Sequence, residues 1–251
     1  MNRSYCKAFN RIIILLVISY NLNSQTTFQW AKKFNGNFAC HIDCIKTDAS
    51  GNVYLTGLFE GTVDFDPSPA IKNKTAVGNQ DAFITKFNSS GTLLWVITYG
   101  DTDYDYGRDI LIDNNGKILV TGITFGGTID FDPGPGTNIL SYPSLTGFLV
   151  KLNPDGTLIS ADLKEYYGTQ MCFDSNQNLI ITGPYDLAKI DPSGNLLWKD
   201  TLYFWCGGRI RRLAVDHSDQ IIIGGEFCGP VDSDPAHADL QSVLPIRQKS
   251  N

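Results

Sequence analysis

Glutamate is scarce in this sequence, and a long basic run is absent from it. Glu60, Glu165 and Glu226 are three of its 26 acidic residues, and the others are aspartate. Aspartate is common in turns and unfavourable inside helices, so this balance argues against long amphipathic helices. The formal net charge of −6 argues against a nucleic-acid partner, because nucleic-acid-binding domains usually carry a basic patch.

No apolar stretch is long enough to cross a bilayer as a helix, which needs about 20 residues. The first 24 residues instead begin with basic side chains, continue with the apolar run 12–20 and end in a short polar stretch. That order predicts a secretory signal peptide over residues 1–24, with cleavage after Ser24. We therefore expect a secreted or cell-surface protein with no membrane span after signal cleavage.

An odd number of cysteines, five of the six, remains after this cleavage, because one lies in the predicted signal peptide. Export permits disulfides, and Cys206 and Cys228 are the pair best placed for one because they lie in successive strand segments of one repeat. Cys40, His41 and Cys44 are close in sequence, but no second pair follows at the spacing of a zinc site. The remaining cysteines are predicted to be single core residues.

The most informative feature that is present is an internal repeat. A ten-residue segment begins with aspartate, passes through a polar turn into a β-branched apolar stretch and closes on glycine. Another apolar stretch precedes each copy, so each unit predicts strand, tight turn and strand. The four copies are residues 48–57, 113–122, 174–183 and 216–225, and the predicted hairpins lie near 44–57, 109–122, 170–183 and 211–225.

Two further strands follow each of the first three hairpins, joined by a second turn that ends in glycine. Trp95 and Trp198 hold equivalent positions in the fourth strand, and Ser160 replaces them in the middle copy. Each complete unit is thus predicted to contain four short antiparallel strands. The predicted third strands are 81–88, 147–153 and 186–191, and the predicted fourth strands are 92–99, 157–163 and 195–202.

The spacing of the repeats indicates the architecture. The closing glycines are separated by 65, 61 and 42 residues, and a 23-residue insertion between the second and third strands accounts for the two longer spacings. A four-stranded unit of about 40–45 residues is typical of a β-propeller blade. The sequence therefore predicts an all-β protein, a partial β-propeller of four-stranded antiparallel blades.

Both ends of the repeat region bear on the number of blades. Residues 27–34 align with a fourth strand, with Trp30 at the Trp95 position, so we expect the N-terminal strand to act as the fourth strand of a blade. The last unit lacks its third and fourth strands, which leaves about 3.5 blades in residues 25–238. Residues 239–251 match no earlier segment. We expect either a truncated gene product or an open array of blades completed by self-association.

Several blocks recur in a fixed order over about residues 28–235. They are D-x-x-G-N-V-Y-x-T-G, G-T-V-D-F-D-P, D-A-F-I-T-K-F and G-T-L-L-W. Together they resemble the seven-bladed β-propeller (SBBP) repeat of secreted bacterial proteins. The resemblance implies a non-catalytic extracellular propeller, often one module of a larger surface or adhesin-like protein, and it supplies no catalytic residues.

Paired aspartates in the insertions are candidate calcium ligands. Residues i and i+2 of an extended strand face the same side, so two carboxylates could flank one hard cation. The alternative is that each aspartate caps a turn before proline, which needs no metal. The pairs are Asp64 and Asp66, Asp130 and Asp132, and Asp232 and Asp234.

A second acidic group resembles the start of an EF-hand loop. Asp101, Asp103 and Asp105 alternate, but Tyr106 stands where that loop needs glycine and Ile112 where it needs glutamate. We therefore predict a solvated turn between blades. The basic cluster Arg209, Arg211 and Arg212 is predicted to be a solvated strand edge, with an anion site as the alternative.

No residue set predicts catalysis, since the acids repeat from blade to blade and the three histidines lie at unrelated repeat positions. We expect a module with a binding or structural role at the cell surface, with an extracellular glycan or protein as partner and no cofactor apart from the candidate calcium. The insertions, which carry Phe65 and Phe131, are expected to project from one rim and serve recognition. The alternative is a propeller-fold enzyme acting on glycans, a glycosidase or lyase.

Overall fold

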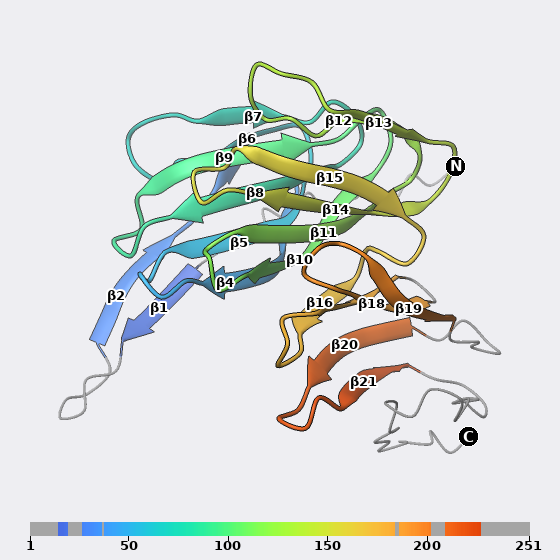
Figure 1. The fold of residues 1–251 in the computed structure, drawn as a ribbon. Coiled ribbons are helices and arrows are strands. Elements are labelled where there is room, and N and C mark those ends of the chain that lie inside the picture. Colours follow the sequence, from blue (N-terminus) through green and yellow to red (C-terminus); the bar gives the residue numbers. More distant parts are fainter. Residues whose placement is uncertain (1–14, 20–26, 37, 184–185, 202–208, 227–251) are drawn as a thin grey trace, which may run out of the picture.

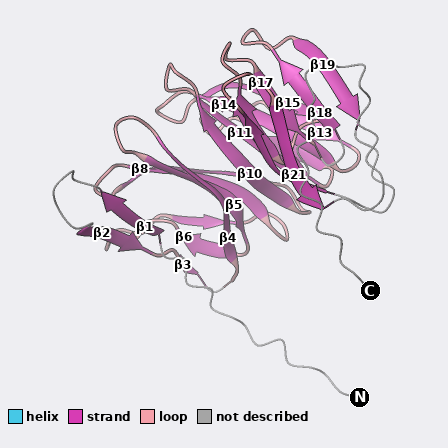
Figure 2. Cartoon of the chain, turned by 90° about the horizontal axis from the view of Figure 1, so that it is seen from below, coloured by secondary structure: helices cyan, strands magenta, loops and turns pink. Residues whose placement is uncertain are grey.

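The computed structural model describes residues 15–19, 27–36, 38–183, 186–201 and 209–226. Throughout these residues every regular element is a β strand (Figure 2). The described residues accordingly contain no helix that is long and apolar enough to cross a membrane. The chain is all-β, as its sequence predicts.

Three four-stranded antiparallel sheets follow one another along the chain (Figure 1). In each, the strands pair in chain order, first to fourth, and we call the sheets blades 1, 2 and 3. This confirms the predicted four-stranded blades; no closed sheet is found in the described part of the chain. Blade 1 contains β4 (Cys40–Thr47), β5 (Val53–Phe59), β8 (Asp81–Phe87) and β9 (Leu93–Tyr99); blade 2 contains β10 (Asp105–Ile112), β11 (Ile118–Thr124), β14 (Thr146–Leu152) and β15 (Leu158–Lys164); blade 3 contains β16 (Gln170–Phe173), β17 (Leu179–Thr182), β18 (Asp186–Ile190) and β19 (Leu196–Thr201).

A fourth hairpin, β20 (Arg209–Val215) and β21 (Ile221–Glu226), follows blade 3. The first strands of successive repeats contact one another: β10 contacts β4 and β16, and β16 contacts β20. We call the side where these first strands meet the inner edge. Hydrophobic clusters fill the spaces between successive blades, so the apolar residues on both faces of each blade are covered by its neighbours.

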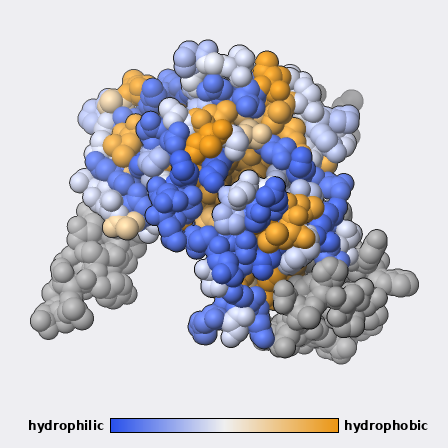
Figure 3. Space-filling view, in the orientation of Figure 1, coloured by the Kyte–Doolittle hydropathy of each residue, from blue (hydrophilic) through white to orange (hydrophobic). Residues whose placement is uncertain are grey.

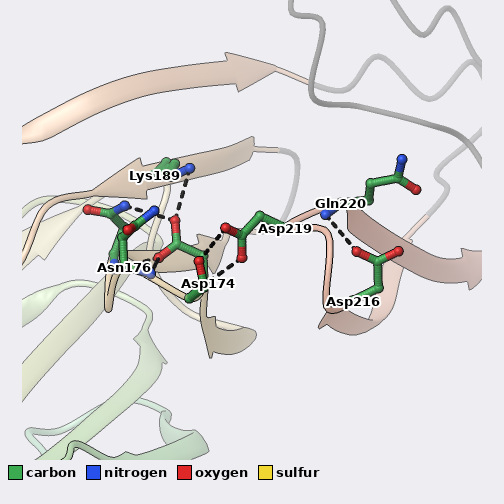
Figure 4. A network of polar contacts seen from close by, with 8 residues as sticks. Asp174, Asn176, Lys189, Asp216, Asp219 and Gln220 are labelled. Atoms are coloured by element: carbon green, nitrogen blue, oxygen red, sulfur yellow. Dashed lines mark hydrogen bonds and ion pairs between the residues drawn. The ribbon is translucent and has the colours of Figure 1, made fainter.

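The turn inside each hairpin is held by the aspartate that opens the repeat. Asp174 Oδ1 accepts hydrogen bonds from the backbone N–H groups of Asn176 and Asn178, at 2.9 and 2.8 Å, and its Oδ2 lies 3.0 Å from Lys189 Nζ (Figure 4). Bonds of the same kind, to the N–H groups two and four residues on, are made by Asp48, Asp113 and Asp216. The conserved spacing of the motif is therefore the geometry of this turn.

The turn also explains the glycine of the D-x-x-G motif. Gly51 and Gly116 have φ of 76° and 75°, a left-handed conformation that favours glycine. Gln177 and Asp219 occupy the equivalent positions in the other two copies, with φ of 63° and 61°. Asp219 also accepts a hydrogen bond from the backbone N–H of Ser175 at 2.8 Å, which links the last hairpin to blade 3 (Figure 4).

The closing glycines of the first two repeats lie against the first strand of the same repeat. A Cβ at Gly57 would lie 1.8 Å from His41 O, and one at Gly122 would lie 2.0 Å from Tyr106 O. The strand register shifts beside these contacts, between Ile42 and Cys44 in blade 1. A side chain at either position would push the two strands apart, so glycine occupies this position inside both second strands.

The N-terminal strand β2 (Thr27–Lys32) pairs with β1 (Leu15–Ser19). Trp30 Nε1 donates a hydrogen bond to Ser89 O at 3.0 Å, and Trp95 Nε1 donates one to Pro154 O at 3.4 Å. Each acceptor lies two residues before the glycine of the next blade's second turn. Trp30 therefore contacts blade 1 as Trp95 contacts blade 2, so β2 packs against blade 1 as a fourth strand packs against the next blade. Among the described strands β2 pairs with β1 alone, and its pairing as the fourth strand of a blade stays a prediction. Ser24, at the predicted cleavage point, lies outside the described residues.

The insertions form small hairpins at one side of the blades, at the top of Figure 1. Phe65 and Phe131 are completely buried, Phe65 against Phe34 and Phe83. The insertions lie at one side of the blades, as expected (Figure 1), but these two phenylalanines are buried and anchor the insertions in the core. A role of the insertions in recognition stays a prediction. The strands are β6 (Thr62–Asp64), which pairs with β3 (Asn35–Gly36) and β7 (Asn73–Thr75), and the pair β12 (Gly127–Asp130) and β13 (Ile139–Tyr142).

Candidate binding pocket at the inner edge

A pocket of about 360 Å³ lies at the inner edge. The first strand of every repeat, or the residue next to it, contributes to its lining, so the pocket exists only where the four repeats come together. Strand β11 and the loops after β11 and β13 add apolar side chains. The lining residues are Asp43, Tyr106, Arg108, Ile123, Phe125, Leu145, Thr169, Gln170, Ile210, Arg211 and Arg212.

Four of these residues hold one position of the repeat. Asp43, Arg108, Thr169 and Arg211 each lie five residues before the aspartate of their hairpin turn. The same repeat position, in the first strand or directly before it, therefore lines the same pocket in all four repeats, and three different residue types, aspartate, arginine and threonine, occupy it. A scaffold that repeats its turns and its core but varies this position presents a specific surface.

The pocket carries an excess of positive charge. Arg108 Nη1 lies 3.1 Å from Asp43 Oδ1, and the Arg108 guanidinium lies 4.7 Å from the centre of the Tyr106 ring. Arg211 and Arg212 are exposed at the other side, and Arg212 Nη1 donates to Arg211 O at 2.7 Å. Three guanidinium groups and one carboxylate give the lining a formal charge of +2, on a chain whose net charge is −6.

Aromatic rings form one wall of the pocket. Phe125 lies 5.7 Å from Tyr106 and 6.0 Å from Tyr104, measured between ring centres. Phe125 and Tyr104 are 45% and 40% exposed, so their rings remain accessible. Partial burial raises the pKa of Tyr106 above its ordinary value, so the ring is neutral at physiological pH and its hydroxyl can donate a hydrogen bond.

The similarities of this chain to known proteins concern its repeat fold and assign it no function. No family model matches the chain. The chain is 23% identical over 200 residues to an uncharacterised WD repeat-containing protein of Acanthamoeba polyphaga mimivirus, covering 65% of this chain and 14% of that protein. It is 27% identical over 157 residues to the regulatory protein FlaEY of Caulobacter vibrioides, covering 59% of this chain and 16% of that protein. The chain is a β-propeller-like repeat protein.

The chain spans about a seventh of the length of these curated relatives, 14% and 16% respectively. A crystal structure of a protein of unknown function from Bacteroides caccae is similar at a TM-score of 0.44 and 11% identity, covering 77% of this chain and 56% of that one.

The sequence predicts a solvated strand edge for Arg211 and Arg212, with an anion site as the alternative. The structure places both, exposed, in the lining of this pocket. The side chain of Arg209 lies outside the described residues. Arg108 and Asp43 were missed because they are isolated in sequence and meet only through the contact of β4 with β10. Their sequence signal is the position five residues before the turn aspartate, where the residue type changes from repeat to repeat although the rest of the repeat is regular.

The candidate calcium ligands hold the turns of the insertions. Asp64 Oδ1 accepts hydrogen bonds from the backbone N–H groups of Asp66 and Lys72, at 3.1 and 2.8 Å. Asp130 Oδ1 makes the same two contacts, with the N–H groups of Asp132 at 3.0 Å and Asn138 at 2.8 Å. Within the described ranges no group of three or more His, Cys, Asp or Glu side chains is arranged to hold a metal. Calcium binding stays a prediction, and Asp232 and Asp234 lie outside the described residues.

Substitution of Asp64 separates the turn role from a calcium role. Asp64→Ala is expected to lower the free energy of unfolding by about 1–2 kcal/mol because two backbone N–H groups lose their acceptor. Asp64→Asn keeps an acceptor oxygen and is expected to lower it by less than about 0.5 kcal/mol. Urea denaturation with calcium and with chelator measures both. A turn role is contradicted if calcium stabilises the wild type and both variants lose that stabilisation equally.

The described cysteines are free thiols in the core. Cys44 Sγ donates to Asp109 Oδ1 at 3.0 Å, and Cys40 is 7% exposed. Burial raises the pKa of both thiols to about 12, so they stay protonated and unreactive at physiological pH. This agrees with single core cysteines; Cys206 and Cys228, the predicted disulfide pair, lie outside the described residues.

The acidic group expected in a solvated turn is mostly buried. Asp101 and Asp105 are 8% and 0% exposed, and Asp103 alone of the three is exposed. Asp101 accepts from the N–H groups of Asp103 and Thr128, both at 2.9 Å, and its own N–H donates to Asp105 Oδ2 at 3.0 Å. The segment is buried because it connects blade 1 to both β10 and the second insertion, which sequence spacing does not reveal.

Proposed function

We propose that the chain is a secreted, non-catalytic β-propeller module of the SBBP-repeat kind that binds an anionic glycan in the pocket at the inner edge. The observation that carries the proposal is the set of unlike side chains, Asp43, Arg108, Thr169 and Arg211, that four repeats direct to one pocket. All the lining residues follow residue 24, so removal of the predicted signal peptide leaves the pocket complete.

The chemistry of the pocket supports an anionic sugar polymer. Guanidinium groups bind carboxylate and sulfate groups through paired hydrogen bonds, and Arg108 and Arg212 both stand at the pocket. The accessible rings of Phe125 and Tyr104 suit the apolar face of a sugar ring. Because the net charge of the chain is −6, the positively charged lining is expected to attract an anionic ligand that the chain as a whole repels.

The geometry also favours binding over hydrolysis. Glycosidases use two carboxyl groups that face one bond at a separation of about 5–9.5 Å. Asp43 is the carboxylate among the described lining residues, and it is ion-paired with Arg108. An enzyme acting on glycans remains the second hypothesis, and the same experiment tests it.

A glycan array tests the proposal with the mature protein. Acidic glycans are expected to bind and neutral ones are not, and Arg212→Gln is expected to weaken binding at least tenfold, since Arg212 lines the pocket and its removal leaves the Asp43–Arg108 ion pair intact. Lys164→Gln removes an exposed positive charge on β15, outside the pocket, and is the matched control.

Three results would contradict the proposal. The first is equal binding of acidic and neutral glycans, and the second is an Arg212→Gln variant that binds as tightly as Lys164→Gln. The third is the release of shortened glycan fragments during incubation, detected by mass spectrometry, which would establish the enzyme instead. Raising the salt concentration is expected to weaken binding, because exposed charges are screened.

A further inference from the structure

A different part of the molecule, the space between blades 2 and 3, departs from the pattern of its neighbours. Between blades 1 and 2, Trp95 of β9 lies beside Tyr54, with 6.2 Å between ring centres, and its Nε1 donates to Pro154 O. A Cβ at Gly156 would lie 3.3 Å from the Trp95 ring. Trp30 covers the preceding turn in the same way, 3.0 Å from Ser89 O. An indole ring thus lies on the turn at both of these positions.

The third position of this kind has no indole ring. Ser160 of β15 lies four residues after its turn glycine, as Trp95 does, and Asp162 stands where β9 has Ile97. A Cβ at Gly194, the turn glycine of blade 3, would meet nothing within 4 Å. Two large apolar side chains are therefore replaced by small or polar ones on the face that meets the next blade.

The replacement leaves an open cleft of about 730 Å³, which we call the β15 cleft. The hydrophobic cluster between blades 1 and 2 draws on Trp95 and Ile97 of β9, whereas the cluster between blades 2 and 3 draws on no described residue of β15. The volume lies within the range of about 300–1,000 Å³ that is usual for ligand sites. Its lining includes Asp113, Leu119, Leu149, Lys151, Asp162 and Asp191.

The β15 cleft has an apolar floor and a charged rim. Leu119, at the position of Tyr54, and Leu149 form part of the floor. The lining carries Asp113, Asp162 and Asp191 with two lysines, Lys117 and Lys151, a formal excess of one negative charge. Lys164, outside the lining, lies with its Nζ 3.1 Å from Asp162 Oδ1, so Asp113 and Asp191 are the carboxylates that carry the excess. Such a cleft suits a flat apolar ring whose neighbours carry positive charge.

We propose that the β15 cleft binds the tryptophan side chain of a partner polypeptide, with basic residues on either side of that tryptophan. The indole ring takes the place that Trp95 takes between blades 1 and 2, and its N–H donates to Pro192 O, the carbonyl equivalent to Pro154 O. Two occupied copies of the same arrangement within this chain support this occupant, because Trp30 and Trp95 show which ring and which donor the turn accepts. The neighbouring carboxylates attract the basic flanks.

Titration of the full chain with short peptides tests the proposal. The probes are the blocked peptide Gly-Lys-Trp-Lys-Gly, the same peptide with alanine for tryptophan, and free indole. Titration calorimetry measures the affinity of each probe. The tryptophan peptide is expected to bind, and the alanine peptide at least tenfold more weakly. Binding of free indole without binding of the peptide would overturn the assignment to a polypeptide.

Filling the cleft from within is the complementary test. Ser160→Trp is expected to raise the Tm, because the new ring would make between blades 2 and 3 the contacts that Trp95 makes between blades 1 and 2. The same ring would fill the cleft and is expected to weaken peptide binding at least tenfold. Leu94→Trp, at an exposed position of β9 outside the cleft lining, is the control and is expected to leave peptide binding unchanged. A Ser160→Trp variant that folds and binds the peptide like the wild type would overturn the proposal.

A milder variant keeps the test decisive if Ser160→Trp does not fold. Asp162→Ile introduces the side chain that β9 carries at this position and removes one rim carboxylate. It is expected to weaken binding of the basic tryptophan peptide several-fold. Unchanged binding by Asp162→Ile would contradict the place of the ligand beside β15.

Discussion

Phe131→Ala is expected to lower the free energy of unfolding by about 3–5 kcal/mol, the range for removing a large buried aromatic side chain. Phe131 is 0% exposed although it lies in an insertion. Its ring centre lies 5.1 Å from Tyr99 of blade 1 and 5.6 Å from Phe148 of blade 2. Alanine would leave a cavity at the junction of two blades, which the strands around it are too constrained to close.

Phe125→Ala is the matched control for this substitution. Phe125 lies at the start of the same insertion but is 45% exposed, so its loss is expected to cost less than about 1 kcal/mol. Urea denaturation followed by tryptophan fluorescence measures both variants. Equal losses of unfolding free energy for the two variants would show that the insertion is not anchored through Phe131.

Asp105→Asn is expected to raise the free energy of unfolding at pH 7–8 by about 2–3 kcal/mol. Burial, and then the nearby charges of Asp101 and Asp81, raise the pKa of Asp105 from 3.8 to about 6. Asp105 is 0% exposed, and its Oδ1 has no hydrogen-bond partner among the described residues. The ionised form is thus disfavoured in the folded protein, and asparagine removes that charge.

The sign of the pH dependence follows from the raised pKa. Below about pH 4 the carboxyl group is protonated in both the folded and the unfolded chain, so the wild type and Asp105→Asn are expected to be equally stable there. Between pH 4 and pH 6 the carboxyl group is ionised in the unfolded chain but still largely protonated in the folded protein. The free energy of unfolding of the wild type therefore falls as the pH rises through this range. Above pH 6 the difference in unfolding free energy is expected to be constant.

Denaturation series at pH 4, 5, 6 and 7.5 provide the measurement for this second prediction. Asp103→Asn is the control, since Asp103 is an exposed neighbour in the same segment, and its stability difference from the wild type is expected to stay near zero across the series. A difference between Asp105→Asn and the wild type that grows as the pH falls would contradict the assigned environment of Asp105.

Much of the fold could be predicted because its determinants are local. The turn aspartate binds N–H groups two and four residues away, as Asp174 does, and the glycine three residues after it has a left-handed φ, as at Gly51. These short-range requirements recur at a fixed spacing, so four hairpins and three four-stranded sheets follow from the sequence. The closing glycines Gly57 and Gly122 are explained by contacts within their own hairpin, with the first strand of the same repeat.

The candidate sites depend on contacts between residues that are distant in sequence. Asp43 and Arg108 are 65 positions apart and form an ion pair only because first strands of successive repeats meet. Ser160 read alone is a weak difference between repeats; it becomes the wall of a cleft only when β15 faces the second turn of blade 3. Sequence periodicity shows that a position varies, and packing decides what that variation exposes.

The sequence by itself determined the strand order within each blade, the turn chemistry and the number of repeats, because hydrogen bonds over two to four residues dictate them. Only the tertiary structure decided the direction of individual side chains. In the folded chain Phe65, Phe131 and Asp105 are buried. One repeat position lines a shared pocket, and the β15 cleft stays open between blades 2 and 3. The physical reason is that burial and shared pockets arise where separate blades pack together, and the repeat pattern of a single blade does not contain that contact.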